Sequence, residues 1–152
     1  MTTMTATTTQ IYQVFIRATP EQIWEAITNP EFTEKYFYGV RIDARNGRRV
    51  VHGPDGDLWG DEQLLECDPP RRLVHGWSSV YDEEMAKEEP SRVTWEIEER
   101  EQGLCLLTVV HDQLEGAPKT AESVSGPGWM YVLSGLKTLL EVGRPMVEPH
   151  DQ

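Results

Sequence analysis

The stretch PGWMYVLSGLKTLLEVG, residues 127–143, sets the architecture of this chain. Its large apolar residues recur at intervals of three and four, which places them on one face of an α-helix: Trp129, Val132, Leu133, Leu136 and Leu140. Pro127 suits a first helical turn, Ser125 before it is a candidate N-cap, and Gly143 is a typical C-terminal signal. A helix with one apolar face must pack on another element, so we expect a sheet around it.

Most of the chain upstream of this helix has the residue pattern of β-strands. Alternation is clearest where Val93, Trp95 and Ile97 share one face and the polar residues between and after them, a threonine and two glutamates, take the other. Turn residues separate the segments, as Asn46-Gly47 does, and short turns favour antiparallel pairing. The segments expected as strands are 11–17, 40–44, 48–52, 58–67, 72–80, 91–100 and 104–114.

Two short helices are expected over residues 18–37, directly after the first strand. Thr19, Pro20 and Gln22 have the pattern of a capping box with proline at the first helical position. Asn29-Pro30 then interrupts the helix, because a residue before proline avoids the helical region. The order of strand, two helices, antiparallel strands and one long helix predicts an α+β protein.

Length and charge limit the class of protein. The chain has 152 residues and a formal net charge of −12, which disfavours a nucleic-acid partner because phosphate binding needs clustered cations. No apolar run is long enough for a membrane span, and no signal peptide is recognisable, so we expect a cytoplasmic protein. We expect one domain over residues 10–143, a disordered tail over 1–9 and a frayed tail over 144–152.

The small clusters in the sequence have simple interpretations. Cys67 and Cys105 lie in apolar strand-like runs and are expected to be free, buried thiols. The arginines of RNGRRV (residues 45–50), which are Arg45, Arg48 and Arg49, are interpreted as part of a solvated hairpin turn, and the acidic run 82–90 as an exposed loop. The four histidines lack metal-like spacing with carboxylates or thiols, so we expect neither a metal nor a cofactor.

Five segments in this order resemble the SRPBCC superfamily, which contains the START and birch-pollen-allergen proteins. Within it, they are most similar to the family named after the activator of heat-shock protein 90 ATPase. The segments are ATPEQIWEAITNPEFTEKYF (18–37), ECDPPRRLVHGW (66–77), SRVTWEIEE (91–99), CLLTVVHDQL (105–114) and GWMYVLSGLKTLLE (128–141).

The resemblance implies a helix-grip fold, a curved antiparallel sheet wrapped around a long C-terminal helix, with an elongated cavity between them. In such relatives the cavity often takes an apolar or amphipathic small molecule. His75 stands where many members have an aromatic or aliphatic residue, which implies a more polar cavity here. Because the superfamily includes carriers, cyclases and co-chaperone domains, the fold alone does not specify the function.

Inward-facing aromatic and polar residues are the candidates for a ligand site, since small-molecule pockets combine large apolar surfaces with a few polar groups. For the tryptophans, the alternative is that they only pack in the core. For the histidines, two interpretations stay open: hydrogen-bonded core residues, or groups that bind a ligand or act in acid–base catalysis. The predicted cavity residues are Tyr36, Tyr38, His75, Trp77, Trp95, Val109, His111, Trp129, Leu133 and Leu136.

Three hypotheses follow from these residues and the resemblance. The favoured one is a module that carries or sequesters a small hydrophobic molecule, in a transport or stress-response role. The second is a cyclase or dehydratase that uses His75 or His111 as general base. The third is a co-chaperone-like regulator of an ATPase. A homodimer is a further expectation, because an exposed sheet edge can pair with the edge of a second copy.

Overall fold

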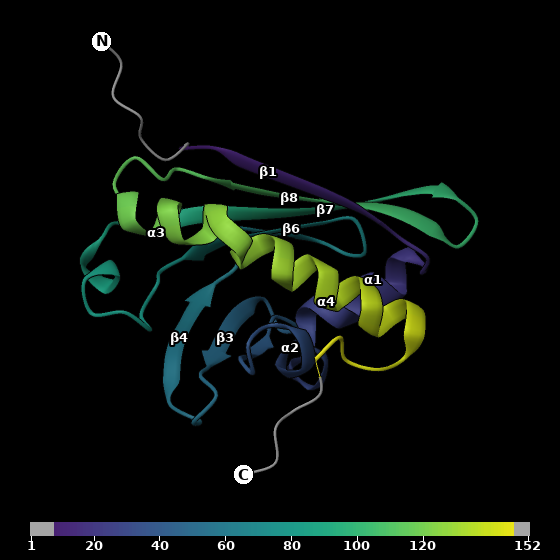
Figure 1. Cartoon of the computed structure of the whole chain (residues 1–152), viewed down its shortest axis with the longest axis horizontal. Helices are drawn as coiled ribbons and strands as arrows, with labels where there is room; N and C mark the ends of the chain where they lie inside the picture. The colour runs from purple at the N-terminus through teal and green to yellow at the C-terminus, as the bar shows by residue number, and fades with distance from the viewer. Residues whose placement is uncertain (1–7, 148–152) are drawn as a thin grey trace.

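A five-stranded antiparallel sheet is the main layer of the computed structural model, which describes residues 8–147 except for the side chains of residues 126 and 127 (Figure 1). Its strand order is β1-β8-β7-β6-β5. The strands are β1 (Gln10–Ile16), β5 (Glu66–Asp68), β6 (Arg72–Trp77), β7 (Ser91–Glu101) and β8 (Leu104–Asp112). The predicted tail over residues 1–9 lies almost wholly outside the described residues, as does most of the one over 144–152.

A second sheet of three strands, β2 (Arg41–Asp43), β3 (Arg48–His52) and β4 (Leu58–Gln63), continues the curve of the first. The single strand expected over 58–67 is therefore two strands. The backbone changes partner between Leu64, whose N–H bonds Gly47 O at 3.0 Å, and Leu65, whose N–H bonds Val74 O at 2.9 Å. This switch divides the predicted curved layer into two hydrogen-bonded sheets.

The two short helices form where the sequence predicts them, as α1 (Pro20–Thr28) and α2 (Pro30–Tyr36). The capping box is complete: Gln22 N–H donates to Thr19 Oγ1 at 3.1 Å, and the Gln22 side chain accepts from Thr19 N–H at 2.8 Å. Asn29 ends α1 and caps α2 through a 2.9 Å bond from Glu31 N–H.

The C-terminal helix begins earlier than the sequence predicts. The segment α3 (Pro118–Ser123) passes through a π-helical turn (Val124–Gly128) into α4 (Trp129–Val142). Ser125 is not an N-cap, because its hydroxyl bonds Glu122 O at 3.0 Å. The start is capped from the acidic loop instead: the Glu88 carboxylate accepts from the backbone N–H groups of residues 119 and 120, at 2.7 and 3.0 Å. This partner is remote in sequence, which explains the missed boundary.

The far end of α4 follows the prediction. Gly143 adopts the left-handed conformation, with φ of 86°, and its N–H bonds Leu139 O at 2.9 Å. Side chains of α4 also bond the backbone at the end of β1, where Lys137 donates to Phe15 O and Glu141 accepts from Arg17 N–H. The helix thus covers part of this sheet edge, and the homodimer stays a prediction.

The core lies where α4 crosses the concave face of the five-stranded sheet (Figure 1). Four of the five periodic residues of the helix are buried as expected, and Leu140 is partly buried against the core. Gly135 lets α4 approach α2 closely, since a Cβ there would lie 3.1 Å from Tyr36 Cβ. The buried residues facing one another include Ile16, Leu73, Val93, Ile97, Leu107, Val109, Trp129, Val132, Leu133 and Leu136. Cys105 is buried, but Cys67 is exposed, contrary to the prediction. Within residues 8–147, no helix is long and apolar enough to cross a membrane.

Candidate functional site

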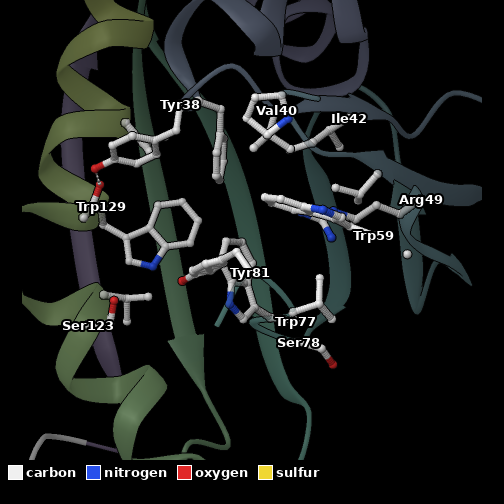
Figure 2. A pocket seen from close by; sticks show the side chains of 18 of the residues that line it. Tyr38, Val40, Ile42, Arg49, Trp59, Trp77, Ser78, Tyr81, Ser123 and Trp129 are labelled. Atoms are coloured by element: carbon white, nitrogen blue, oxygen red, sulfur yellow. Dashed lines mark hydrogen bonds between the residues drawn. The ribbon is translucent and has the colours of Figure 1, made fainter. Parts of the chain in front are cut away.

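A cavity of about 670 Å³ lies between the start of α4 and the three-stranded sheet (Figure 2). Figure 2 shows Trp129 on the helical side, Trp59 and Arg49 on the opposite side, and Trp77 between them. Its size falls within the range of about 300–1,000 Å³ typical of small-molecule sites. The cavity thus lies to one side of the main core.

Three aromatic rings in tilted and edge-to-face contact form the deep wall of this cavity. The Trp77 and Trp129 ring centroids are 5.6 Å apart, and Phe37 lies 6.1 Å from the former and 6.0 Å from the latter. The Trp77 indole N–H is satisfied by Ser79 Oγ at 3.0 Å, so the ring presents its apolar surface to the cavity. Rings held at these separations give a rigid apolar surface with little conformational entropy to lose on binding.

Two further aromatic pairs stand around the cavity. Tyr38 stacks on Tyr131 with centroids 4.8 Å apart, and Trp59 stacks on Tyr81 at 5.9 Å. Tyr38 and Tyr81 are about half exposed, so they belong to the entrance. Gly53 makes room for the Trp59 indole, because a Cβ at this position would lie 2.3 Å from the ring. The cavity is therefore aromatic from its wall to its mouth.

Arg49 is the one positively charged residue among those that line the cavity. Its side chain comes from β3, is only 9% exposed, and lies over the Trp77 ring at 5.6 Å. Burial lowers the pKa of this guanidinium to about 10, partly opposed by the negative charge of Glu62, so Arg49 remains charged at neutral pH. A buried cation normally has an ion-pair partner, and in the described part of the chain Arg49 has neither an ion pair nor a hydrogen bond.

The interpretation of these three arginines as a solvated hairpin turn is therefore wrong for Arg49. Arg45 and Arg48 are exposed and pair with Asp43 and Asp61, as expected of a solvated turn. Arg49 points inward with Val51, because residues i and i+2 of a strand share a face. Strand alternation across RRVVH was the signal that could have identified it.

Both candidate histidines lie deep on the five-stranded sheet, and each accepts a hydrogen bond from a tryptophan. Trp95 Nε1–H donates to His75 Nε2 at 3.0 Å, and Trp129 Nε1–H donates to His111 Nδ1 at 3.1 Å. The two histidines are cross-strand neighbours of the same residue, Val93. In each ring, the nitrogen that carries no proton is thus already occupied by an indole donor.

The remaining ring nitrogens are satisfied as well. His75 Nδ1 donates to Gly76 O at 2.8 Å, and His111 Nε2 donates to Ser91 Oγ at 2.7 Å. Burial lowers the pKa of His75 well below its ordinary value, with the Arg49 charge acting in the same direction. Burial also lowers the pKa of His111 to about 4, so both rings are neutral near pH 7. They are fully satisfied core groups.

The structure brings three of the ten predicted cavity residues to the cavity: Tyr38, Trp77 and Trp129. The cavity lies over the three-stranded sheet, whereas α4 covers the inner face of the five-stranded sheet and fills that space. Tyr36, for instance, donates to Ala26 O at 2.8 Å, and burial raises the pKa of its hydroxyl. The residues outside the lining are Tyr36, His75, Trp95, Val109, His111, Leu133 and Leu136.

Several lining residues were missed by sequence reasoning. Trp59 lies in a segment expected as a strand, and Arg49 lies where the predicted hairpin turn leads into a strand. Tyr81 lies between a predicted strand and the acidic loop, and no local motif marks any of the three as part of a site. They meet only because the three-stranded sheet folds back toward the end of β6. Among the described residues, no cluster of three or more histidine, cysteine or acidic side chains could hold a metal ion.

Sequence comparison assigns the chain to a family. The model described as "Activator of Hsp90 ATPase homolog 1-like protein" matches residues 17–141. The chain belongs to this family. The order of elements and the sheet around the C-terminal helix give it the helix-grip fold of the SRPBCC superfamily, as the sequence resemblance implied. A search of curated proteins found no match to this chain.

Solved structures share the fold of this family member. Protein MLL2253 from Mesorhizobium loti is 21% identical, with a TM-score of 0.70 over 88% of this chain and 97% of that one. CalU16 from Micromonospora echinospora is 25% identical, with a TM-score of 0.64 over 88% and 74%. DynU16, from the dynemicin biosynthetic locus, is 23% identical, with a TM-score of 0.68 over 91% and 49%.

Proposed function

We propose that this protein binds a small apolar or amphipathic molecule in the cavity between the start of α4 and the three-stranded sheet. The observation that carries the proposal is a void of about 670 Å³ walled by aromatic side chains. Folded interiors are normally packed to crystal-like density, and a void of this size with an apolar wall needs a reason. Carriage or sequestration of the ligand fits a cavity whose wall, in the described part of the chain, contains no histidine or cysteine.

The hydrogen bonds of the histidines argue against a cyclase or dehydratase mechanism. A general base needs a free lone pair within reach of the substrate. In His75 and His111 that lone pair accepts an indole N–H, and neither ring lines the cavity. The co-chaperone alternative rests on the family name and on no feature of this site.

Binding of the neutral fluorophore N-phenyl-1-naphthylamine tests the proposal. Saturable binding should quench tryptophan emission, since Trp59, Trp77 and Trp129 line the cavity. The blocking variant is Gly60→Leu: this residue lines the cavity, and a Cβ there meets nothing within 4 Å. The new side chain should fill the void and weaken binding at least about 10-fold, while folding is retained because added apolar burial is favourable.

The matched control is Gln63→Leu, an exposed position on the same strand that does not line the cavity. It adds an equivalent apolar side chain outside the site and should leave binding unchanged. Absence of saturable binding by the wild-type protein, or equal binding by the Gly60→Leu variant, would count decisively against the cavity as the site.

A further inference from the structure

The charge distribution in the cavity narrows the class of ligand, on the assumption that the cavity binds a small molecule as proposed above. Among the described residues, two that line the cavity are charged: Arg49 and Glu62. They are cross-strand partners on β3 and β4 and so share a face. Arg49 is nine-tenths buried, whereas Glu62 is exposed. The deep charge of the cavity is thus positive, in a protein whose net charge is −12.

The Arg49 guanidinium has no partner of its own. Among residues 8–147 it makes no hydrogen bond. Glu62 does not come close enough for an ion pair, because the Glu62 carboxylate lies beside Gly76, with Oε1 3.2 Å from the position that a Cβ on Gly76 would take. No polar side-chain atom in the described part is both fully buried and unpartnered. The guanidinium nitrogens must therefore retain accessible surface. Arg49 borders the cavity and also a void of about 10 Å³ toward His75 and Trp95, and of these two spaces the cavity alone has room for more than a single water molecule.

A guanidinium that is nine-tenths buried and has no ion pair is costly to maintain in an apolar site. Its five N–H donors form a planar fork that matches a carboxylate or a similar anion in two parallel hydrogen bonds. The Trp77 ring beneath it fixes its orientation at 5.6 Å. Donors held in place before the ligand arrives lose little entropy on binding.

We propose that the ligand is an amphipathic anion: an aromatic or aliphatic body that packs on Trp77 and Trp129, with a carboxylate or equivalent anionic group held by Arg49. The anionic group enters at the three-stranded sheet, and the apolar body extends toward α4 (Figure 2). A wholly apolar ligand would leave the Arg49 donors desolvated and unpaired, and so would bind more weakly.

Two fluorophores with the same ring system test this proposal. The anion 1-anilinonaphthalene-8-sulfonate differs from neutral N-phenyl-1-naphthylamine by its sulfonate group. The wild-type protein should bind the anion about 10-fold to 100-fold more tightly, the range expected for charge-assisted hydrogen bonds. General electrostatics would produce the opposite preference, because the protein is strongly acidic. Competition by 2-naphthoate but not by 2-naphthamide extends the test to a carboxylate.

Variants at the two charged lining residues show which side chain is responsible for the preference for the anion. Arg49→Met should abolish the preference for the anion. Binding of the neutral probe should be retained or strengthened, because no guanidinium donor is left unpaired beneath it, and saturable binding of this probe also shows that the variant is folded. Arg48→Met is the matched control, because Arg48 is the preceding residue of β3, faces outward and pairs with Asp61 at 2.8 Å. It should bind like the wild type. Glu62→Gln should strengthen anion binding by about twofold to fivefold, since it removes the one opposing carboxylate of the lining.

The outcomes separate the two proposals. Equal binding of both probes, with no effect of Arg49→Met, would overturn the anionic ligand while leaving the cavity as a binding site. Binding of neither probe would overturn the proposed function, and this inference with it. A loss of anion binding in Arg48→Met equal to that in Arg49→Met would assign the effect to surface charge and also overturn the inference.

Discussion

The five-stranded and three-stranded sheets both pack near the start of α4, but they differ in whether their buried polar groups have hydrogen-bond partners. On the five-stranded sheet, His75 and His111 are buried and every ring nitrogen has a hydrogen-bond partner. On the three-stranded sheet, the buried Arg49 has none in the described part of the chain and borders a void. The first region is solid and the second is hollow, although both are rich in tryptophan.

This difference separates packing from binding better than residue type does. Histidines on inward faces are typical candidates for catalysis, but a ring with both nitrogens satisfied has no capacity left for a substrate. A buried polar group without a partner has that capacity, and its desolvation cost is recovered only when a ligand supplies the partner. The four predictions below use stability and binding to test whether the two regions really differ in this way.

The largest effect on stability is expected from His75→Leu. This change leaves the buried Trp95 indole N–H and Gly76 carbonyl without partners, and each unsatisfied group costs about 1–3 kcal/mol. We expect the free energy of unfolding to fall by about 2–4 kcal/mol in urea denaturation. The double variant with Trp95→Phe should lose less than the sum of the two single losses. A loss for His75→Leu within experimental error would mean that the pair does not hold the core.

Acid should destabilise the protein through the same region. The pKa of His111 falls from its ordinary value to about 4 on folding. Below about pH 6.5 the histidine is therefore protonated in the unfolded chain but stays neutral in the folded protein, so acid favours the unfolded state. The contribution of His111 to the free energy of unfolding is thus fully present above pH 6.5. By pH 5 the free energy of unfolding should fall by about 2 kcal/mol through His111 alone, and His75 acts in the same direction. Urea denaturation between pH 7 and 5 measures this slope. His111→Gln should flatten it, and an equally steep slope in that variant would assign the effect elsewhere.

On the hollow side, Gly53→Ala should change binding more than stability. The added methyl group would lie 2.3 Å from the Trp59 indole, so the ring must move within the cavity wall. We expect about threefold to tenfold weaker binding of N-phenyl-1-naphthylamine, with about 1 kcal/mol of stability lost to overpacking. Gly60→Ala adds the same methyl group where no atom lies within 4 Å and should bind nearly as well as the wild type. Unchanged binding in Gly53→Ala would remove Trp59 from the site.

The smallest effect on stability is expected from Arg49→Met. The change removes a cation–π contact worth about 0.5–1 kcal/mol, but it also removes a desolvated charge that has no ion pair. The two effects nearly cancel, so the free energy of unfolding should stay within about 1 kcal/mol of the wild-type value. A loss as large as that of His75→Leu would make Arg49 a structural residue and remove the contrast between the two regions.

Local patterns in the sequence were sufficient for most of the fold. The capping box at Thr19, the Asn29-Pro30 break and Gly143 act through hydrogen bonds and backbone angles within a few residues, so they can be read directly from the sequence. The inward faces of β7 and β8 follow from alternation for the same reason. The boundaries that escaped prediction depend on distant partners, as in the capping of α3 by Glu88 and the change of sheet at Leu64.

The candidate site could be predicted only in outline. Trp77 and Trp129 were identifiable as inward-facing aromatic residues, but Trp59, Tyr81 and Arg49 come from three segments that have no common motif. The histidines were identified as polar groups on inward faces, and their indole partners could not be found without the relative positions of β6, β7 and α4. Satisfaction of a buried polar group is a property of its surroundings in space.

The amino-acid order alone therefore established the α+β class, the antiparallel strands and the amphipathic helix, because period, capping and turn residues act over short distances along the chain. The fold in space decided where the interior is solid and where it is hollow, and which buried cation lacks a counter-charge. Those properties depend on how volumes and charges from distant segments fit together, and no local pattern encodes that fit.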